Sequence, residues 1–93
     1  MIFELGFLEE ALKEWRKLDN SVRVQFKEKL SERLTNPRVP SAKLSGHKDR
    51  YKIKLHSIGY RLVYEGRDHE FVVIVIAVGK REGGAAYKAA AKR

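Results

Sequence analysis

Residues 51–78 read YKIKLHSIGYRLVYEGRDHEFVVIVIAV, and this stretch decides the fold of the chain. It contains three runs, 51–55, 60–65 and 71–78, that are rich in β-branched and aromatic residues and are separated by short turns. Runs of this kind are typical of consecutive strands, so the stretch predicts a three-stranded antiparallel meander. The last run is apolar on both faces. We therefore expect it to be a central strand covered by helices on at least one face.

The residues before this stretch predict one strand and two helices. Apolar side chains alternate from Ile2 to Phe7, which indicates a first strand. From Glu9 onward the apolar residues recur every three or four positions, as in an amphipathic helix. A second helical stripe runs from Val22 to Leu34 and ends before Pro37. We expect the two helices to form a helical hairpin.

The helix patterns also assign roles to aromatic and charged residues. Trp15 and Phe26 lie within the apolar stripes, so we expect them in the core and not in contact with nucleic-acid bases. Alternating charges in the segments EEALKEWRK and KEKLSER indicate solvated helix surfaces, and we assign them no catalytic role.

Two remaining segments complete the expected fold. Residues 36–50 contain two prolines and several small polar residues, which predict a surface loop without regular structure. After the meander, Gly83 and Gly84 precede an Ala- and Lys-rich segment that predicts a short C-terminal helix. The expected fold is α+β: a single small domain over 1–93, in which the N-terminal strand and the meander form a four-stranded sheet.

The composition indicates a small basic protein. The 93 residues carry a formal net charge of +8, which is typical of proteins that bind nucleic acid. A soluble protein with a basic surface and no such partner would have the same charge. The chain has no cysteine, which excludes disulfides and thiolate chemistry. No apolar run reaches the length of about 18 residues that spans a membrane, and the first residues lack the basic start of a secretory signal. We expect a cytoplasmic protein.

Two lysines in the run YKIKL point to a phosphate site. Because side chains alternate along a strand, Lys52 and Lys54 share one face, and their Cα atoms lie about 7 Å apart. At an effective dielectric constant near ~20, two charges at this distance repel each other by about 2 kcal/mol. We expect one amine of such a pair to give up its proton more readily than an isolated lysine does. Its charged neighbour can stabilise a phosphate transition state.

Other side chains around the expected sheet extend this cationic surface. Arg61 shares a strand face with Val63, and its planar guanidinium suits bidentate contact with phosphate oxygens. Arg81 follows the last strand, and Tyr87 lies near the start of the final helix, where it could stack on a base, handle a proton or simply pack. The remaining cations expected to contact RNA are Lys43, Lys48, Arg50 and Lys80.

No metal or cofactor motif is present in the sequence. The three histidines, at positions 47, 56 and 69, fall in expected loops or turns without the spacing of metal ligands, and we expect them to be exposed. No acidic pair, phosphate-binding glycine loop or nucleophile motif occurs. An enzyme with this sequence is expected to work without metal or cofactor.

Several short motifs follow one another in an order that identifies a family. Segments ALKEWRKL, KLSG, YKIKL, GYRLVY and VGKRE, the last followed by a tyrosine, extend over nearly the whole chain. In order and spacing they resemble the RelE-type toxins of bacterial and archaeal toxin–antitoxin pairs.

The resemblance implies a ribosome-dependent messenger RNA endonuclease. Toxins of this type enter the ribosomal A site, cut the codon there and stop translation. The ribose 2′-hydroxyl attacks the adjacent phosphate without a metal and leaves a 2′,3′-cyclic phosphate and a 5′-hydroxyl. The implied partners are a cognate antitoxin, the ribosome with its RNA, and messenger RNA; no membrane or metal is implied.

The functional positions of that family carry over onto Lys52, Lys54, Arg61, Arg81 and Tyr87. Lys54 would be the general base, with Tyr87 as the competing candidate, and Lys52 and Arg61 would stabilise the phosphate charge. Arg81 would assist the leaving 5′-oxygen, and Tyr87 could instead stack on a base.

Two other functions are compatible with the same fold. A ParE-type relative would inhibit DNA gyrase by binding, and a non-catalytic module would use the basic sheet only to hold RNA. The presence of all four cations at the carried-over positions favours the nuclease.

Overall fold

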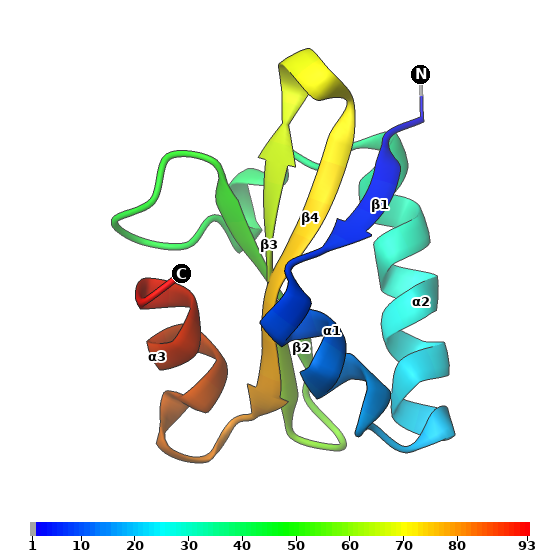
Figure 1. Ribbon diagram of the computed structural model, residues 1–93, viewed down its shortest axis with the longest axis vertical. Coiled ribbons are helices and arrows are strands. Elements are labelled where there is room, and N and C mark those ends of the chain that lie inside the picture. Colours follow the sequence, from blue (N-terminus) through cyan, green and yellow to red (C-terminus); the bar gives the residue numbers. More distant parts are fainter. Residues whose placement is uncertain (1) are drawn as a thin grey trace.

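The computed structural model describes residues 2–93 and shows one α+β domain, in agreement with the predicted fold class (Figure 1). Helices lie on both sides of a single four-stranded sheet. The strands are β1 (Glu4–Phe7), β2 (Arg50–Leu55), β3 (Tyr60–Arg67) and β4 (Val72–Lys80). The α-helices are α1 (Glu9–Arg16), α2 (Asn20–Thr35) and α3 (Ala85–Ala91). In the described part of the chain, no helix is long and apolar enough to cross a membrane.

The sheet has the strand order β1-β4-β3-β2. Strands β2, β3 and β4 form the predicted antiparallel meander, and β1 pairs in parallel with β4. This parallel pairing makes β4 an interior strand, as its apolar character on both faces predicts. Strand β2 is consequently at the edge of the sheet, and it carries Lys52 and Lys54 there.

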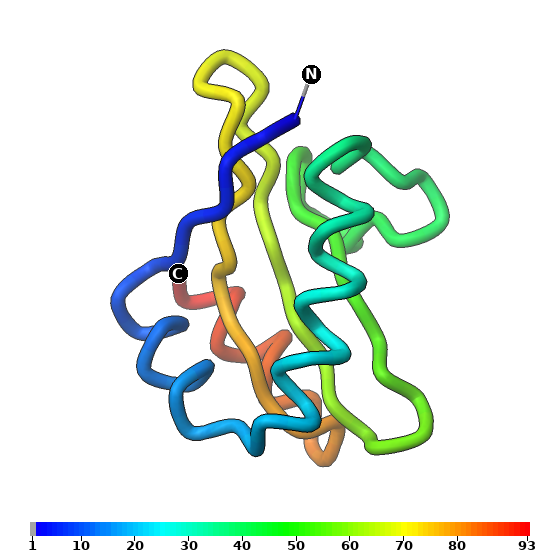
Figure 2. The backbone as a smooth tube through the Cα atoms, turned by 90° about the vertical axis from the view of Figure 1, so that its right-hand side faces the viewer, coloured from blue at the N-terminus to red at the C-terminus, as the bar shows by residue number. Residues whose placement is uncertain are grey.

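Helices α1 and α2 cover one face of the sheet, and Figure 2 shows α2 lying in front of the strands. Trp15 and Phe26 are buried in this layer, which confirms that they are core residues. Full burial of a side chain such as Phe26 contributes about 1.5–3 kcal/mol. The strands contribute Tyr51, Ile53, Leu55, Leu62, Tyr64, Val73, Val75 and Val78.

Helix α3 packs on the opposite face over a smaller apolar cluster of Val63, Ile76, Ala77 and Ala90. A β-bulge helps to build this second layer. Val63 pairs with Ala77 but Tyr64 pairs with Val75, so Ile76 has no partner in the register. The bulge turns both Ile76 and Ala77 toward α3. The same irregularity leaves backbone groups of β4 free for side-chain contacts that hold the end of the chain.

The connection between α2 and β2 is more ordered than the sequence predicts. A 3₁₀ turn spans Pro40–Ala42, Lys43 forms an isolated bridge with Tyr51, and Arg50 is already the first residue of β2. The expectation of a loop without regular structure over 36–50 was therefore wrong in part. Its order comes from contacts with residues far away in sequence.

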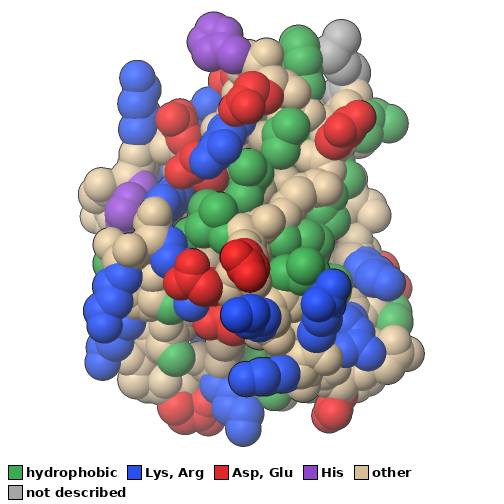
Figure 3. Space-filling model, viewed as in Figure 1, with side chains coloured by type: hydrophobic (Ala, Val, Ile, Leu, Met, Phe, Trp, Pro, Cys, Tyr) green, Lys and Arg blue, Asp and Glu red, His purple; other side chains and the backbone are tan. Residues whose placement is uncertain are grey.

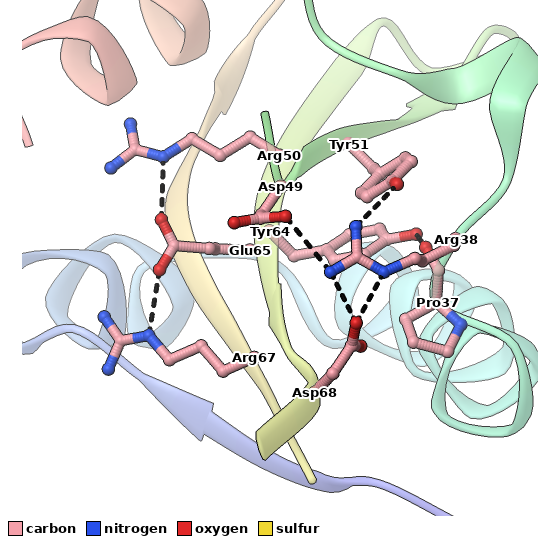
Figure 4. Close-up of polar contacts among 9 residues, drawn as sticks. All are labelled: Pro37, Arg38, Asp49, Arg50, Tyr51, Tyr64, Glu65, Arg67 and Asp68. Atoms are coloured by element: carbon pink, nitrogen blue, oxygen red, sulfur yellow. Dashed lines mark hydrogen bonds and ion pairs between the residues drawn. The ribbon is translucent and has the colours of Figure 1, made fainter. Parts of the chain in front are cut away.

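Arg38 fixes the start of this connection (Figure 4). Its guanidinium bonds Asp68 at 2.7 and 2.9 Å, Asp49 at 3.1 Å and the Tyr51 hydroxyl at 3.2 Å. The Asp68 hydrogen bond, followed by that of Tyr51, raises the pKa of Arg38, so the side chain keeps its charge. The Tyr64 hydroxyl adds a second anchor by donating to the Pro37 carbonyl at 2.6 Å.

Candidate active site

Strand register brings the predicted cations onto the sheet face that α3 partly covers. Lys54 pairs directly with Arg61, which pairs with Gly79 on β4. In the next row Lys52 pairs with Val63. Side chains of directly paired residues project to the same side, with Cβ atoms about 4.5–5.5 Å apart. The structure therefore sets Lys52 and Lys54 on one face, as alternation predicts, and the strand register adds Arg61 to that face.

The three cations differ in their exposure. Lys54 is exposed, whereas Lys52 and Arg61 are half-buried. One amino group of Arg61 donates to the carbonyl of Tyr60 at 3.0 Å, which restrains the guanidinium next to the strand. Lys54 is thus the most accessible of the three, whereas Lys52 and Arg61 are partly shielded from solvent.

Arg81 reaches the same area from the end of β4. Its backbone N–H donates to the Gly59 carbonyl at 2.9 Å. Gly59 has φ +67°, and a Cβ at this position would lie 3.6 Å from Cδ and Nε of Arg81. The arginine side chain therefore packs along the β2–β3 turn, close to the strand ends that carry Lys54 and Arg61. It is exposed, as a substrate contact requires.

Tyr87 comes to this face on α3. A Cβ at Gly79 would lie only 3.4 Å from the Ala86 backbone nitrogen and 3.6 Å from the Ala85 Cβ, so the glycine permits the close approach of α3. Tyr87 packs against the Val63 and Ala77 cluster. Its hydroxyl is buried and has no hydrogen-bond partner among residues 2–93. Tyr87 therefore lies on the same sheet face as the cations, but its hydroxyl is shielded from solvent.

Two arginines attach α3 to the rest of the fold. Arg93 forms a double hydrogen bond with Glu14, at 2.8 and 3.0 Å, and donates to the Ile76 carbonyl at the bulge. Arg50 donates to the Ala90 carbonyl at 2.7 Å. At the other end of α3, Gly83 and Gly84 have φ values of +65° and +63° and form the connection to β4. Arginine side chains thus hold the C-terminal end of the helix, and two glycines connect its N-terminal end to β4.

The residues expected to contact RNA divide into two groups. Lys43, Lys48 and Lys80 are exposed and free of ion pairs among residues 2–93. Arg50 is instead held by Glu65 at 3.1 Å and by the Ala90 carbonyl, so the structure gives it a role inside the fold (Figure 4). Figure 3 shows basic and acidic side chains intermixed on the face of Figure 1, so the net charge is not gathered there.

Glu65 makes the stability of this region depend on pH. Burial raises its pKa, but hydrogen bonds from Arg67 and Arg50 more than offset this, and the net pKa lies below the value of 4.5 for a free glutamate. A carboxyl group with a lowered folded pKa stabilises the protein above its unfolded pKa, and this stabilisation is lost as pH falls through the folded pKa.

We expect Glu65→Gln to lower the free energy of unfolding near neutral pH and to have a smaller effect in acid. Denaturant unfolding of both proteins between about pH 7 and pH 3 measures this difference. The difference should narrow once the pH falls below the value of 4.5 for the free carboxyl. A difference that is constant over this range would show that the charge of Glu65 is not responsible.

Sequence patterns missed Arg33, which lies beside the predicted cations. It belongs to the charged segment KEKLSER, which the helix pattern indicates as a solvated surface. In the structure its guanidinium donates to the Lys52 carbonyl and to the Tyr64 hydroxyl. His56, which is exposed as expected, lines the same surface hollow as Arg33, Lys52 and Lys54. No local signal could have shown this, because the contacts join α2 to β2 and β3, which lie far from it in sequence.

Comparison with known sequences gives one family and several full-length relatives. Residues 5–83 match the family described as ParE toxin of type II toxin-antitoxin system, parDE. The mRNA interferase toxin RelE of Escherichia coli (strain K12) is 56% identical over 93 residues, which are 100% of this chain and 98% of that protein. A putative RelE-like toxin protein of Escherichia coli is 50% identical over the same shares of the two chains.

Solved structures agree with this assignment. A mutant E. coli toxin RelE in the free state superposes with a TM-score of 0.91 at 55% identity and covers 100% of this chain and 98% of that one. The toxin in the intact E. coli RelBE toxin–antitoxin complex has a TM-score of 0.83 at 57% identity, over 86% of this chain and 98% of its own. An archaeal RelE–RelB complex from Pyrococcus horikoshii OT3, at 19% identity and a TM-score of 0.66, shares the fold.

Proposed function

The chain belongs to the ParE toxin family of type II toxin–antitoxin systems, as a RelE-type toxin, and from this we propose how it cuts RNA. It is the toxin of a toxin–antitoxin pair and an endoribonuclease that cleaves messenger RNA. The proposal concerns the place and the chemistry: cleavage takes place in the ribosomal A site, and the ribose 2′-hydroxyl is the nucleophile.

The observation that carries the chemical proposal is the register of β2 and β3. It pairs the exposed Lys54 with the half-buried Arg61 on one face of the sheet. A phosphate bound between them would have a proton acceptor on one side and a fixed positive charge on the other. A neutral Lys54 amine takes the proton of the 2′-hydroxyl, and O2′ attacks phosphorus.

The leaving group departs as the second bond breaks. The P–O5′ bond breaks as the 2′,3′-cyclic phosphate forms, and the 5′-oxygen leaves with the electron pair and takes up a proton from water. Lys52 and Arg61 stabilise the charge on the non-bridging oxygens, and Arg81 donates to the leaving 5′-oxygen. The side chains present supply a base and three charged donors, and the proposed route requires no metal.

Mapping of RNA ends tests the function as a whole. Purified toxin is added to translating ribosomes, and the 5′ ends of the messenger RNA are located by primer extension. We expect cuts at fixed positions within the A-site codon. Translation arrest without cuts would support RNA binding alone. Arrest of DNA gyrase would support the ParE-type activity. The full-length similarity to mRNA interferases favours the first result.

Tyr87→Phe should change stability and cleavage in opposite directions. In the structure the Tyr87 hydroxyl is buried without a partner, and such a group costs about 1–3 kcal/mol. Its removal should raise the free energy of unfolding. If the hydroxyl turns toward the phosphate when RNA binds, the same change should lower the cleavage rate on ribosomes. Denaturant unfolding and a single-turnover cleavage assay measure the two effects.

The outcome decides which role Tyr87 has. Unchanged cleavage by the phenylalanine variant would remove the hydroxyl from the reaction and leave only a stacking role for the ring. Tyr87→Ala is the matched second variant, because it removes the ring as well. Loss of cleavage with alanine but not with phenylalanine would assign Tyr87 to base stacking.

The partners follow from the same assignment. The intact E. coli RelBE complex and a complex of mutant RelE with an antitoxin peptide each pair the toxin with an antitoxin, and this chain likewise has a cognate antitoxin as its partner. A net charge of +8 favours an antitoxin segment with acidic residues. We further propose that the ribosome is the second partner, with Lys43, Lys48 and Lys80 on its RNA. The toxin would then act in the cytoplasm, where messages are translated.

A further inference from the structure

A basic hollow of about 300 Å³ lies at the outer edge of β2. It extends the face that carries the candidate active site, because Lys52 and Lys54 line both. Across the hollow, α2 contributes Arg33 and the 3₁₀ turn contributes Ser41. Its remaining lining residues are Ala42 and His56.

The charges around this hollow favour an anion. Its titratable lining residues are two lysines, an arginine and a histidine, and no carboxylate lines it. Two other surface hollows, near the start of β2, differ in this respect. One is lined by Asp49, Asp68 and Glu70 together with its basic residues, and the other by Asp49 and Glu65. Of these three hollows, the one beside Lys52 and Lys54 has basic lining residues and no acidic one.

Arg33 is held in position before any ligand arrives. Its Nη1 donates to the Tyr64 hydroxyl at 2.9 Å and approaches the Lys52 carbonyl at 3.4 Å, and its guanidinium carbon lies 5.7 Å from the centre of the Tyr64 ring. Burial, more than offsetting the Arg33 hydrogen bond, raises the pKa of Tyr64, so the tyrosine keeps the proton that it donates to Pro37. Tyr64 is thus a fixed support for the arginine.

The remaining donors of Arg33 are available to a ligand. Its Nε and Nη2 groups have no hydrogen-bond partner among residues 2–93. A planar guanidinium with one amino group anchored and two donor groups free suits the oxygens of a phosphate. Because the entropy of ordering the side chain is already lost in the folded protein, more of the binding free energy is available for the ligand.

We propose that this hollow binds a second phosphate of the messenger RNA, next to the one that is cut. The proposal rests on the endonuclease function, since Lys52 and Lys54 must face the cleaved phosphate for the neighbouring one to reach Arg33. A messenger RNA that crosses the edge of β2 would place consecutive phosphates on the two sides of these lysines. Arg33 then fixes the register of the message and takes no part in proton transfer.

Cleavage kinetics on ribosomes test the role of Arg33. We expect Arg33→Ala to raise the toxin concentration for half-maximal cleavage about tenfold, as for loss of a charge-assisted contact, while the maximal rate changes less than about twofold. Lys29→Ala is the matched control. Lys29 is exposed on the same helix, carries the same charge and does not line the hollow. An equal rise in the toxin concentration for half-maximal cleavage in both variants would overturn the proposal.

A second pair of variants avoids the loss of the contact between Arg33 and Tyr64. Ser41→Glu places a negative charge in the hollow, and Ser21→Glu places the same charge at the start of α2, outside the hollow. Both serines are exposed, so the fold should tolerate both changes. We expect Ser41→Glu to raise the toxin concentration for half-maximal cleavage at least as much as Arg33→Ala does. A similar loss for Ser21→Glu would reject the site.

Direct binding separates this proposal from the function on which it rests. A short single-stranded oligoribonucleotide with 2′-methoxy groups in place of the 2′-hydroxyls cannot be cut, and its binding is followed through the NMR signal of Arg33 Nε–H. A shift that Ser41→Glu suppresses supports the site, even if wild-type toxin fails to cut on ribosomes and the proposed function falls. If the oligonucleotide leaves Arg33 unshifted while ribosomal cleavage depends on it, the phosphate belongs to ribosomal RNA and the proposal is wrong.

Discussion

Lys54→Met should slow cleavage of messenger RNA on ribosomes by about 10²–10⁴-fold, the usual contribution of a general base. The side chain is exposed and makes no hydrogen bond or ion pair among residues 2–93, so the fold should be unaffected. Single-turnover cleavage at saturating toxin measures the chemical step. Lys27→Met, an exposed lysine on α2, is the control and should cut normally.

Lys54→Arg distinguishes proton transfer from simple charge. Arginine keeps the positive charge beside Arg61 but does not lose its proton at any working pH. If Lys54 is the base, the arginine variant should be nearly as slow as the methionine variant. Recovery of most of the rate with arginine would show that position 54 provides electrostatic stabilisation, and Tyr87 would then become the stronger candidate for the base.

Local sequence patterns were sufficient to place the two candidate lysines on one face of the sheet. Strand side chains alternate with a period of two, so the segment YKIKL places both lysines on one side wherever the strand is paired. The register confirms this by setting Lys54 opposite Arg61. The apolar character of β4 also predicted a covered strand. The sequence of β4 did not show that β1 pairs with it in parallel, because the paired residues of the two strands lie more than sixty positions apart in the chain.

Polar contacts over long sequence distances could not be predicted in the same way. Arg50 looks like a loop cation in the sequence, yet it binds Glu65 and a carbonyl of α3. Arg33 looks like part of a solvated helix face, yet Tyr64 holds it at the edge of the sheet. The sequence around each of these arginines has the same pattern as the sequence around a solvated residue. Its role depends on which distant strand lies beside it.

Arg81→Ala should reduce the maximal rate of cleavage by about 10²–10³-fold with little loss of ribosome binding, the size of effect expected for a donor to charge that develops in the transition state. The arginine follows β4, and its side chain packs along the turn at Gly59. From there it can reach a leaving oxygen at the end of the site that carries Lys54 and Arg61. A contact formed mainly as the P–O5′ bond breaks affects the rate and not the affinity.

Lys80→Ala provides the contrast, because Lys80 precedes Arg81 and pairs with Tyr60, whose ring packs toward α1 and α2. Lys80 thus lies on the sheet face covered by α1 and α2, whereas Arg81 follows the strand and packs at the β2–β3 turn. We expect Lys80→Ala to weaken ribosome binding and to leave the maximal cleavage rate almost unchanged. Binding measured by sedimentation with ribosomes, together with single-turnover cleavage, separates the two variants. If Arg81→Ala lost binding and cleavage to the same extent, Arg81 would be a docking contact like its neighbour, and stabilisation of the leaving oxygen would require another donor.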